Sequence, residues 1–339
     1  MKIFQVGGSV RDAILGVEAR DKDWVVVGSS PEEMITEGFK PIGKDFPVFL
    51  HPQSNEEYAL ARTEKKSGKG YKGFKFYFDE TVTLEEDLKR RDFTINSIAK
   101  DKSGSLIDPY GGLEDIKNKI FRQTSKSFSE DPLRCVRYAK FKTYPHLADF
   151  ALEESTEESI KSMGKSGELN HLSADRIWME LKSALDSPKS ANFFSAIISL
   201  GLTKPWFPSI KQFEIDENNT AQLKWVELEL LNNFSLGLSL DLPKEFIELS
   251  NLSFQLANLD VNEDQFDLIS KLEKINFHRH QTNIEQIIKL KYFDNKRDYL
   301  SKLKDNILSK DFSILSEVPK EDMTKIKTEL YIKSIKESK

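Results

Sequence analysis

GGSVRDAILGVEARDKDWVVVG, residues 7–28, sets two glycines, a short helical pattern and two closely spaced aspartates between apolar runs. IFQV before it and WVVV within it are β-rich runs typical of strands. SVRDAILG has helical spacing and stops at Gly16, a common helix terminator. This order of strand, helix and strand predicts a mixed α/β head, which we extend over residues 1–125.

Asp21 and Asp23 stand at the start of the second predicted strand. Side chains two residues apart in a strand project to the same face, so both carboxylates can meet one point. Mg²⁺ commonly takes one or two protein carboxylates and completes its octahedron with water and phosphate oxygens. The alternative is that the two aspartates lie on a solvent-exposed face of the strand and bind no metal.

Gly7 and Gly8 follow the first predicted strand and precede the predicted helix. Glycines permit close backbone approach, and the positive end of a helix attracts phosphate. Arg11 adds a cation, although two glycines before a helix are also typical of an ordinary tight turn. Together with the aspartate pair, the segment predicts a nucleoside triphosphate bound with a metal.

The composition is typical of a well-solvated protein without disulfides or membrane-spanning segments. The 339 residues have a net charge of -5 and 31% charged residues, which favours a well-solvated protein of two or three units, or a helical body behind a compact head. A single cysteine, Cys135, excludes an intramolecular disulfide. Without a bilayer-spanning apolar run or a signal-peptide pattern, we expect a cytoplasmic protein without a membrane partner.

The predicted secondary structure changes from mixed helix and strand to mainly helix near residue 126. TLEEDLKRRDFTINSIAK, residues 83–100, has the spacing of one helix and begins with a plausible capping box formed by Thr83 and Glu86. Beyond residue 126 the strand signals fade and helical spacing dominates. The lysine-rich stretch RTEKKSGKGYKGFK, residues 62–75, is either a solvated hairpin tip or a mobile basic patch able to meet a polyanion.

Four motifs follow one another in order: VGGSVRDAILG with DKDWVVVG, EEDLKRRDFTINSIA, DPYGGLEDI and EDPLRCVRYAKF. In this order they resemble the tRNA nucleotidyltransferase family, namely the CCA-adding enzymes of the bacterial and eukaryotic class. The resemblance implies an α+β fold with a polymerase-β-like nucleotidyltransferase head followed by an all-α neck, body and tail. It places the head at 1–125, the helical neck at 126–210 and the body and tail at 211–339.

The family resemblance also implies an activity, template-independent addition of C, C and A to the 3′ end of tRNA from CTP and ATP, with Mg²⁺ as cofactor. Asp21 and Asp23 are then the catalytic and metal-binding residues. The nucleotide-binding residues implied by the motifs are Gly8, Arg11, Arg91, Asp92, Asp131, Arg134, Arg137 and Lys140.

In this interpretation Asp131 and Arg134 select the base of the incoming nucleotide. An aspartate offers acceptors and an arginine offers donors, so together they can imitate a Watson–Crick edge. Taken alone, their spacing is equally that of an i,i+3 ion pair on one helix. Lys140 stands where the family usually has arginine, so it keeps the charge without the planar fork, and its role is the least defined.

Three further expectations follow from the resemblance. The chain binds the acceptor and T stems of tRNA, works as a monomer or homodimer, and lacks the C-terminal metal phosphohydrolase domain of longer relatives, because it contains no His-Asp dipeptide. The stretch 62–75 fits a lid that accompanies full CCA addition. The alternatives are a poly(A) polymerase, a partial enzyme adding only CC or A, and a catalytically idle RNA-binding protein.

Overall fold

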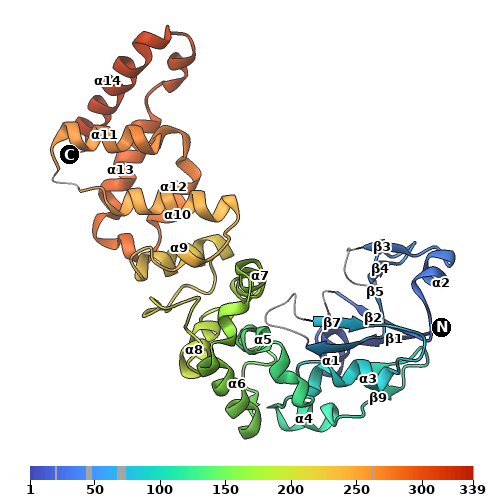
Figure 1. Ribbon diagram of the computed structural model, residues 1–339. Coiled ribbons are helices and arrows are strands. Elements are labelled where there is room, and N and C mark those ends of the chain that lie inside the picture. The colour runs from blue at the N-terminus through green and yellow to red at the C-terminus, as the bar shows by residue number, and fades with distance from the viewer. Residues whose placement is uncertain (20, 43–47, 67–73, 261–262, 339) are drawn as a thin grey trace. The chain divides into compact units, whose positions relative to one another are not determined.

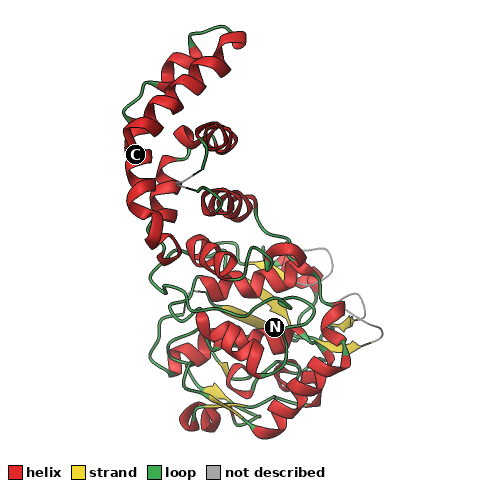
Figure 2. Cartoon of the chain, turned by 90° about the vertical axis from the view of Figure 1, so that its left-hand side faces the viewer, coloured by secondary structure: helices red, strands yellow, loops and turns green. Residues whose placement is uncertain are grey.

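The computed structural model describes residues 1–19, 21–42, 48–66, 74–260 and 263–338. They form two compact units, Met1–Pro205 and Trp206–Lys339. The first unit combines a mixed sheet with helices, and the described part of the second contains helices and no strand (Figures 1 and 2). The predicted α+β class is therefore confirmed. The predicted head and most of the predicted neck lie in the first unit.

A mixed sheet forms the frame of the first unit. Its strands lie in the spatial order β3 Lys40–Ile42, β4 Val48–Leu50, β5 Glu57–Leu60, β2 Asp23–Val27, β1 Lys2–Val6, β8 Ala99–Lys100 and β9 Leu106–Ile107. Only β2 and β5 run parallel, and the other neighbours are antiparallel. The predicted strands IFQV and WVVV are confirmed as the adjacent pair β1 and β2 at the centre of the sheet.

Two smaller pairs of strands complete the first unit. β6 Thr63–Lys66 pairs with β7 Phe74–Tyr77, and β10 Ile120–Phe121 pairs with β11 Ala151–Leu152. Residues 67–73 of the lysine-rich stretch lie outside the described residues, so its predicted role as a lid stays a prediction. The helices of the first unit are α1 Gly8–Ile14, α2 Pro31–Thr36, α3 Leu84–Lys89, α4 Gly112–Asn118, α5 Leu133–Phe141, α6 Glu154–Ser166, α7 Ala174–Leu185 and α8 Ala191–Ser199.

The two faces of the sheet are covered by different helices (Figure 1). Successive residues of a strand point to opposite faces, and the neighbours Val25 and Val26 of β2 do so. Val25 packs in one cluster with Leu88 of α3, whereas Val26 packs in another with Met34 of α2. Burial on both faces fixes the register of β2, because a slip of one residue would exchange the two clusters.

The single helix predicted over residues 83–100 is wrong. Its capping box is confirmed, but α3 ends at Lys89, Phe93 is extended with φ -118° and ψ 150°, and a 3-10 turn covers Thr94–Asn96. The cause is tertiary: the amide of Thr94 donates to the carbonyl of Arg122, and the Phe93 ring is fully buried among other aromatic rings. This pairing outweighs the local helical preference.

Helices around one apolar cluster make up the second unit. The helices are α9 Ala221–Leu231, α10 Lys244–Ala257, α11 Gln265–Ile275, α12 Gln281–Ile288, α13 Arg297–Leu308 and α14 Lys320–Ser338. The cluster runs from Leu223 and Val226 of α9 to Tyr331 and Ile335 of α14. None of the described helices combines the length and apolar character needed to cross a bilayer.

Candidate active site

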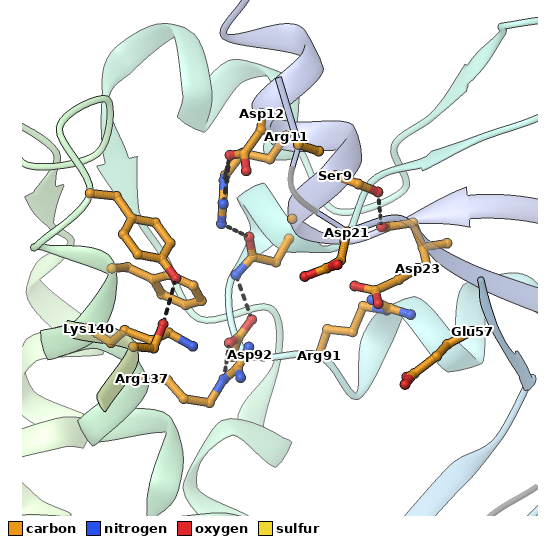
Figure 3. A pocket seen from close by; sticks show the side chains of 18 of the residues that line it. Ser9, Arg11, Asp12, Asp21, Asp23, Glu57, Arg91, Asp92, Arg137 and Lys140 are labelled. Atoms are coloured by element: carbon orange, nitrogen blue, oxygen red, sulfur yellow. Dashed lines mark hydrogen bonds and ion pairs between the residues drawn. The ribbon is translucent and has the colours of Figure 1, made fainter. Parts of the chain in front are cut away.

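One cavity of about 1130 Å³ in the first unit is lined by every site residue predicted from the sequence (Figure 3). The predicted set comprises Gly8, Arg11, Asp21, Asp23, Arg91, Asp92, Asp131, Arg134, Arg137 and Lys140. These residues come from α1, β2 with the residues just before it, the segment after α3, and α5 with the residues just before it. The fold thus brings three separate sequence motifs to one place.

Gly7 and Gly8 carry the chain from β1 into α1 at the wall of the cavity. Gly7 has φ 73°, a left-handed conformation that favours glycine, and a Cβ there would lie 3.0 Å from Nη1 of Arg91 and 3.6 Å from Oδ2 of Asp23. Any side chain at this position would push against the groups facing the cavity. Gly7 is therefore needed for the site, in addition to the predicted Gly8.

The carboxylates of Asp21 and Asp23 face the same part of the cavity, beside the guanidinium of Arg91 (Figure 3). Asp23 is the first residue of β2, but Asp21 precedes the strand, so the predicted placement of both on one strand is wrong in detail. Burial raises the pKa of Asp23 and the charge of Asp21 adds to this, while Arg91 and Arg137 oppose the rise. A cation would relieve the repulsion between the two carboxylates.

Glu57 on β5 pairs in register with Asp23 on β2 and also lines the cavity. The described residues contain no group of three or more histidine, cysteine, aspartate or glutamate side chains arranged to hold a metal. Two carboxylates still fit Mg²⁺, which usually keeps water and substrate oxygens as its other ligands.

Asp87 of α3 anchors two arginines at the cavity. Its fully buried carboxylate accepts from Arg90 at 2.6 Å and from Arg91 at 3.0 Å. Burial alone would raise the pKa of Asp87, but the charges of Arg90 and Arg91 lower it to about 2. The carboxylate thus fixes the guanidinium of Arg91 next to the aspartate pair.

This pairing predicts a pH-dependent contribution to stability. Because the pKa of Asp87 falls from 3.8 to about 2 on folding, its contribution is present above pH 4 and is lost as the pH drops toward 2. Asp87→Asn should lower the free energy of unfolding by about 3–5 kcal/mol at pH 7, since two part-buried arginines lose the buried carboxylate that they share. The difference from the wild type should shrink by about 2 kcal/mol between pH 4 and pH 2.

Urea unfolding of both proteins at several pH values checks this expectation. Glu85→Gln, at an exposed position of the same helix, is the matched control and should follow the wild type. A difference between Asp87→Asn and the wild type that stays constant from pH 7 to pH 2 would refute the role of the carboxylate.

A chain of hydrogen bonds joins α1 to α5 across the floor of the cavity (Figure 3). Nη1 of Arg11 donates to Oδ1 of Asn96 at 2.6 Å, and Nδ2 of Asn96 donates to Oδ1 of Asp92 at 2.9 Å. Nε of Arg137 then donates to Oδ2 of Asp92 at 2.8 Å. Burial alone would raise the pKa of Asp92, but Arg137 and Asn96 hold it well below its usual range. Asp92 is thus the centre of the chain.

Glu180 of α7 continues this chain, and sequence reasoning did not identify it. Its carboxylate lies 2.6 Å from Nζ of Lys140 and 3.5 Å from Nη1 of Arg137. Burial and the charge of Arg137 lower the pKa of Lys140. No local pattern marks Glu180, because it lies on the buried side of an ordinary amphipathic helix.

The ring of Phe141 is shared by three cations. The Cζ atoms of Arg11 and Arg137 each lie 5.3 Å from its centroid, and Nζ of Lys140 lies 4.8 Å away. Cations are attracted to the face of an aromatic ring at such distances. Phe141 therefore gathers cations from α1 and α5, and we name Arg11, Arg137 and Lys140 the cation cluster.

Asp131 and Arg134 both line the cavity, but they do not form an i,i+3 pair on one helix. Asp131 is extended, with φ -114° and ψ 103°, and α5 begins only at Leu133. Its carboxylate pairs instead with Arg176 of α7, whereas Arg134 donates to the carbonyls of Ser127 and Arg90. The two predicted base-reading side chains are thus held separately.

His146 is a further lining residue that the predicted set omits. Its Nε2 lies 3.0 Å from Oδ1 of Asp12, to which Arg11 also donates at 2.8 Å. Burial alone would raise the pKa of Asp12, but His146 and Arg11 lower it. These contacts tie the segment after α5 to α1, beside the cation cluster.

Comparisons with known proteins agree with this architecture. The family model of the Poly A polymerase head domain matches residues 3–122, and a model described as a probable RNA and SrmB-binding site of polymerase A matches residues 149–214. The CCA-adding enzyme of Coxiella burnetii (strain RSA 493 / Nine Mile phase I) is 43% identical over 306 residues, which are 85% of this chain and 80% of that protein.

Two solved structures share the fold at lower identity. The CCA-adding enzyme of Bacillus stearothermophilus in complex with CTP is 24% identical with a TM-score of 0.64, over 96% of this chain and 87% of that one. The CCA-adding enzyme of Thermotoga maritima complexed with tRNA is 20% identical with a TM-score of 0.63, over 98% and 87%. Both structures support the arrangement of elements described above.

Proposed function

Since the chain belongs to the family of CCA-adding enzymes, we propose that it adds C, C and A in turn to the 3′ end of tRNA, using CTP twice and then ATP. The observation that carries the proposal is the cavity in which the aspartate pair and the cation cluster meet. In each step the 3′-hydroxyl oxygen of tRNA bonds to the α-phosphorus, and the bond from that phosphorus to the β-phosphate bridge breaks. Pyrophosphate leaves with the electron pair of the broken bond.

Asp21 and Asp23 would hold Mg²⁺ in this reaction. When bound, Mg²⁺ lowers the pKa of the attacking hydroxyl and offsets charge on the leaving pyrophosphate. The chemistry of the donor set supports this assignment, because two adjacent carboxylates, of which Asp23 has a raised pKa, are stabilised by a cation. Glu57 is not required by the proposal.

The triphosphate is bound and oriented by cations and backbone. We assign this role to the backbone at Gly8, to Arg91 and to the cation cluster, with charge-assisted hydrogen bonds to the phosphate oxygens. Asp92 supports them indirectly, because it fixes Arg137 from one side while Glu180 contacts Arg137 and Lys140 from the other. Catalysis by these residues is mainly positioning and electrostatic stabilisation.

Asp131 and Arg134 would read the base. Cytosine and adenine both present an exocyclic amino group next to a ring nitrogen acceptor on their Watson–Crick edge. A carboxylate accepts from that amino group and a guanidinium donates to that ring nitrogen, whereas uracil and guanine offer the opposite pattern. The shared pattern explains how one pair of side chains accepts CTP and ATP and rejects UTP and GTP.

The remaining parts of the proposal concern RNA and cellular context. We assign base reading and RNA contacts to the neck, residues 126–210, behind the head at 1–125, and further tRNA contacts to residues 211–339. Helical RNA hides its base edges, so the acceptor and T stems would be recognised by shape and backbone. We expect the protein to act in the cytoplasm, as a monomer or homodimer.

Incubation with a tRNA transcript lacking CCA tests the function directly. With CTP alone the product should gain two nucleotides, and with CTP and ATP it should gain three and stop. Gel resolution of single-nucleotide products, with UTP and GTP as controls, makes each step visible. A stop after two cytidines would instead identify a partial enzyme, an adenosine tract a poly(A) polymerase, and no extension an idle RNA-binding protein.

A further inference from the structure

A bidentate ion pair reaches Asp131 from a helix that carries none of the predicted site residues. Nη2 of Arg176 lies 2.8 Å from Oδ2 of Asp131, and Nη1 lies 3.3 Å from Oδ1. Both residues line the cavity, and both side chains are about one-fifth exposed, at 21% and 18%. Arg176 lies in the first turn of α7, 45 residues from Asp131.

Asp131 needs such an external partner because its own backbone is irregular. It lies between the 3-10 turn Lys126–Glu130 and α5, in extended conformation. The bond from the amide of Leu133 to Oδ1 at 3.1 Å is local and engages one oxygen only. A single bond leaves the carboxylate able to rotate, whereas two parallel bonds from one guanidinium fix its plane.

The ion pair leaves the carboxylate able to bind a base. Each carboxylate oxygen has two lone pairs, and a bidentate arginine uses one on each oxygen. A remaining lone pair can accept from the amino group of cytosine or adenine. Arg134 is held independently by the carbonyls of Ser127 and Arg90, so the spacing between acceptor and donor depends on Arg176.

We propose that Arg176 is a positioning residue for nucleotide selection, which fixes the plane of the Asp131 carboxylate so that it accepts from an amino group. This inference rests on the proposed function, because it assumes that Asp131 reads the base. Arg176 does not need to touch the nucleotide. Its effect is on discrimination against UTP and GTP and not on binding of the triphosphate.

A purely structural role for the pair is the competing explanation. The same helix is also anchored by Ile177, Trp178 and Leu181, which are 0%, 4% and 0% exposed. Burial of these side chains contributes far more stability than a part-exposed ion pair does. Loss of Arg176 should therefore leave α7 in place, and selectivity and stability can be measured separately.

The test compares Arg176→Met and Arg176→Lys with Arg122→Met in the full chain. Arg122 forms ion pairs with Asp115 and Glu153 in the same unit and does not line the cavity. For each protein, kcat/KM is measured with CTP, ATP, UTP and GTP on tRNA lacking CCA and on tRNA ending in CC. Inhibition by inorganic pyrophosphate reports the triphosphate subsite alone.

For Arg176→Met we expect the ratio of kcat/KM for the correct nucleotide to that for UTP or GTP to fall about 10- to 100-fold. The inhibition constant of pyrophosphate should change less than about twofold. Arg176→Lys keeps the charge without the fork, so its ratio should lie between those of the wild type and Arg176→Met. Arg122→Met should keep the wild-type ratio.

The outcomes separate the inference from the function on which it rests. If Arg176→Met lowers all four kcat/KM values equally, or only the melting temperature, the positioning role is overturned and CCA addition stands. The positioning role is also overturned if Asp131→Asn loses discrimination while Arg176→Met and Arg176→Lys both keep it. A wild-type protein that fails to extend tRNA overturns the proposed function itself.

Discussion

Asp23→Asn is expected to lower kcat for nucleotide addition by about 1000-fold or more, because on the proposed assignment it removes one of the two carboxylates that hold Mg²⁺ and with it several kcal/mol of transition-state stabilisation. The stability of the folded protein should not decrease. Burial and Asp21 raise the pKa of Asp23, so the charged carboxylate opposes folding, and its neutral amide should leave the melting temperature without metal unchanged or slightly higher.

The matched control is Glu57→Gln, on the strand next to β2. Glu57 is the register partner of Asp23 and lines the same cavity, so both variants remove one carboxylate from neighbouring positions. We expect Glu57→Gln to retain activity within a few-fold in single-turnover extension of tRNA with CTP and Mg²⁺. Full activity of Asp23→Asn, or equal losses in the two variants, would contradict the assignment of the metal to Asp21 and Asp23.

Asp92→Asn should produce the second largest effect, by a different route. Its carboxylate accepts from Nε of Arg137 and from Nδ2 of Asn96, and an amide can accept through only one of its two terminal atoms. A donor then faces a donor, and Arg137 loses one of its two acidic partners while keeping Glu180, which costs about 1–3 kcal/mol of stability. We expect kcat/KM to fall by about 100-fold with CTP and ATP alike.

Urea unfolding and steady-state kinetics measure the two parts of this prediction. Asp101→Asn serves as the control, because Asp101 caps the turn between β8 and β9 by accepting from Ser103 and Ser105 and does not line the cavity. The fall in kcat/KM of Asp92→Asn should leave discrimination among the four nucleotides unchanged. A loss of discrimination as large as that of Asp131→Asn would mean that Asp92 acts on the base and not on the triphosphate.

The sequence alone predicted those parts of the site that depend on local patterns. The strand, helix and strand around residues 6–27 follow from short-range periodicity, and Gly8, Arg11, Asp21 and Asp23 come with them. The one large error among the elements predicted for the head, the single helix over residues 83–100, has a non-local cause. Pairing of residues 93–94 with 122–123 replaces intrahelical bonds by bonds to a distant segment.

The residues missed by sequence reasoning act through partners far along the chain. Arg176 contacts Asp131 across 45 residues and His146 contacts Asp12 across 134. Neither contact leaves a periodic or motif-like trace, because the tertiary fold alone brings α7 and the segment after α5 to the cavity. The positions of Asp131 and Arg134 were predicted, but what holds each of them was not.

The aromatic ring at the centre of the cation cluster links substrate binding to folding. Phe141 is neutral, so it attracts Arg11, Arg137 and Lys140 without cancelling their charge, and the lowered pKa of Lys140 reflects burial and the repulsion that remains. The fold brings the three cations together by giving each an acidic partner, namely Asp12 for Arg11, Asp92 for Arg137 and Glu180 for Lys140. A triphosphate bound as proposed would therefore add its charge to cations that already have acidic partners, and its net gain in binding energy would be smaller than with unpaired cations.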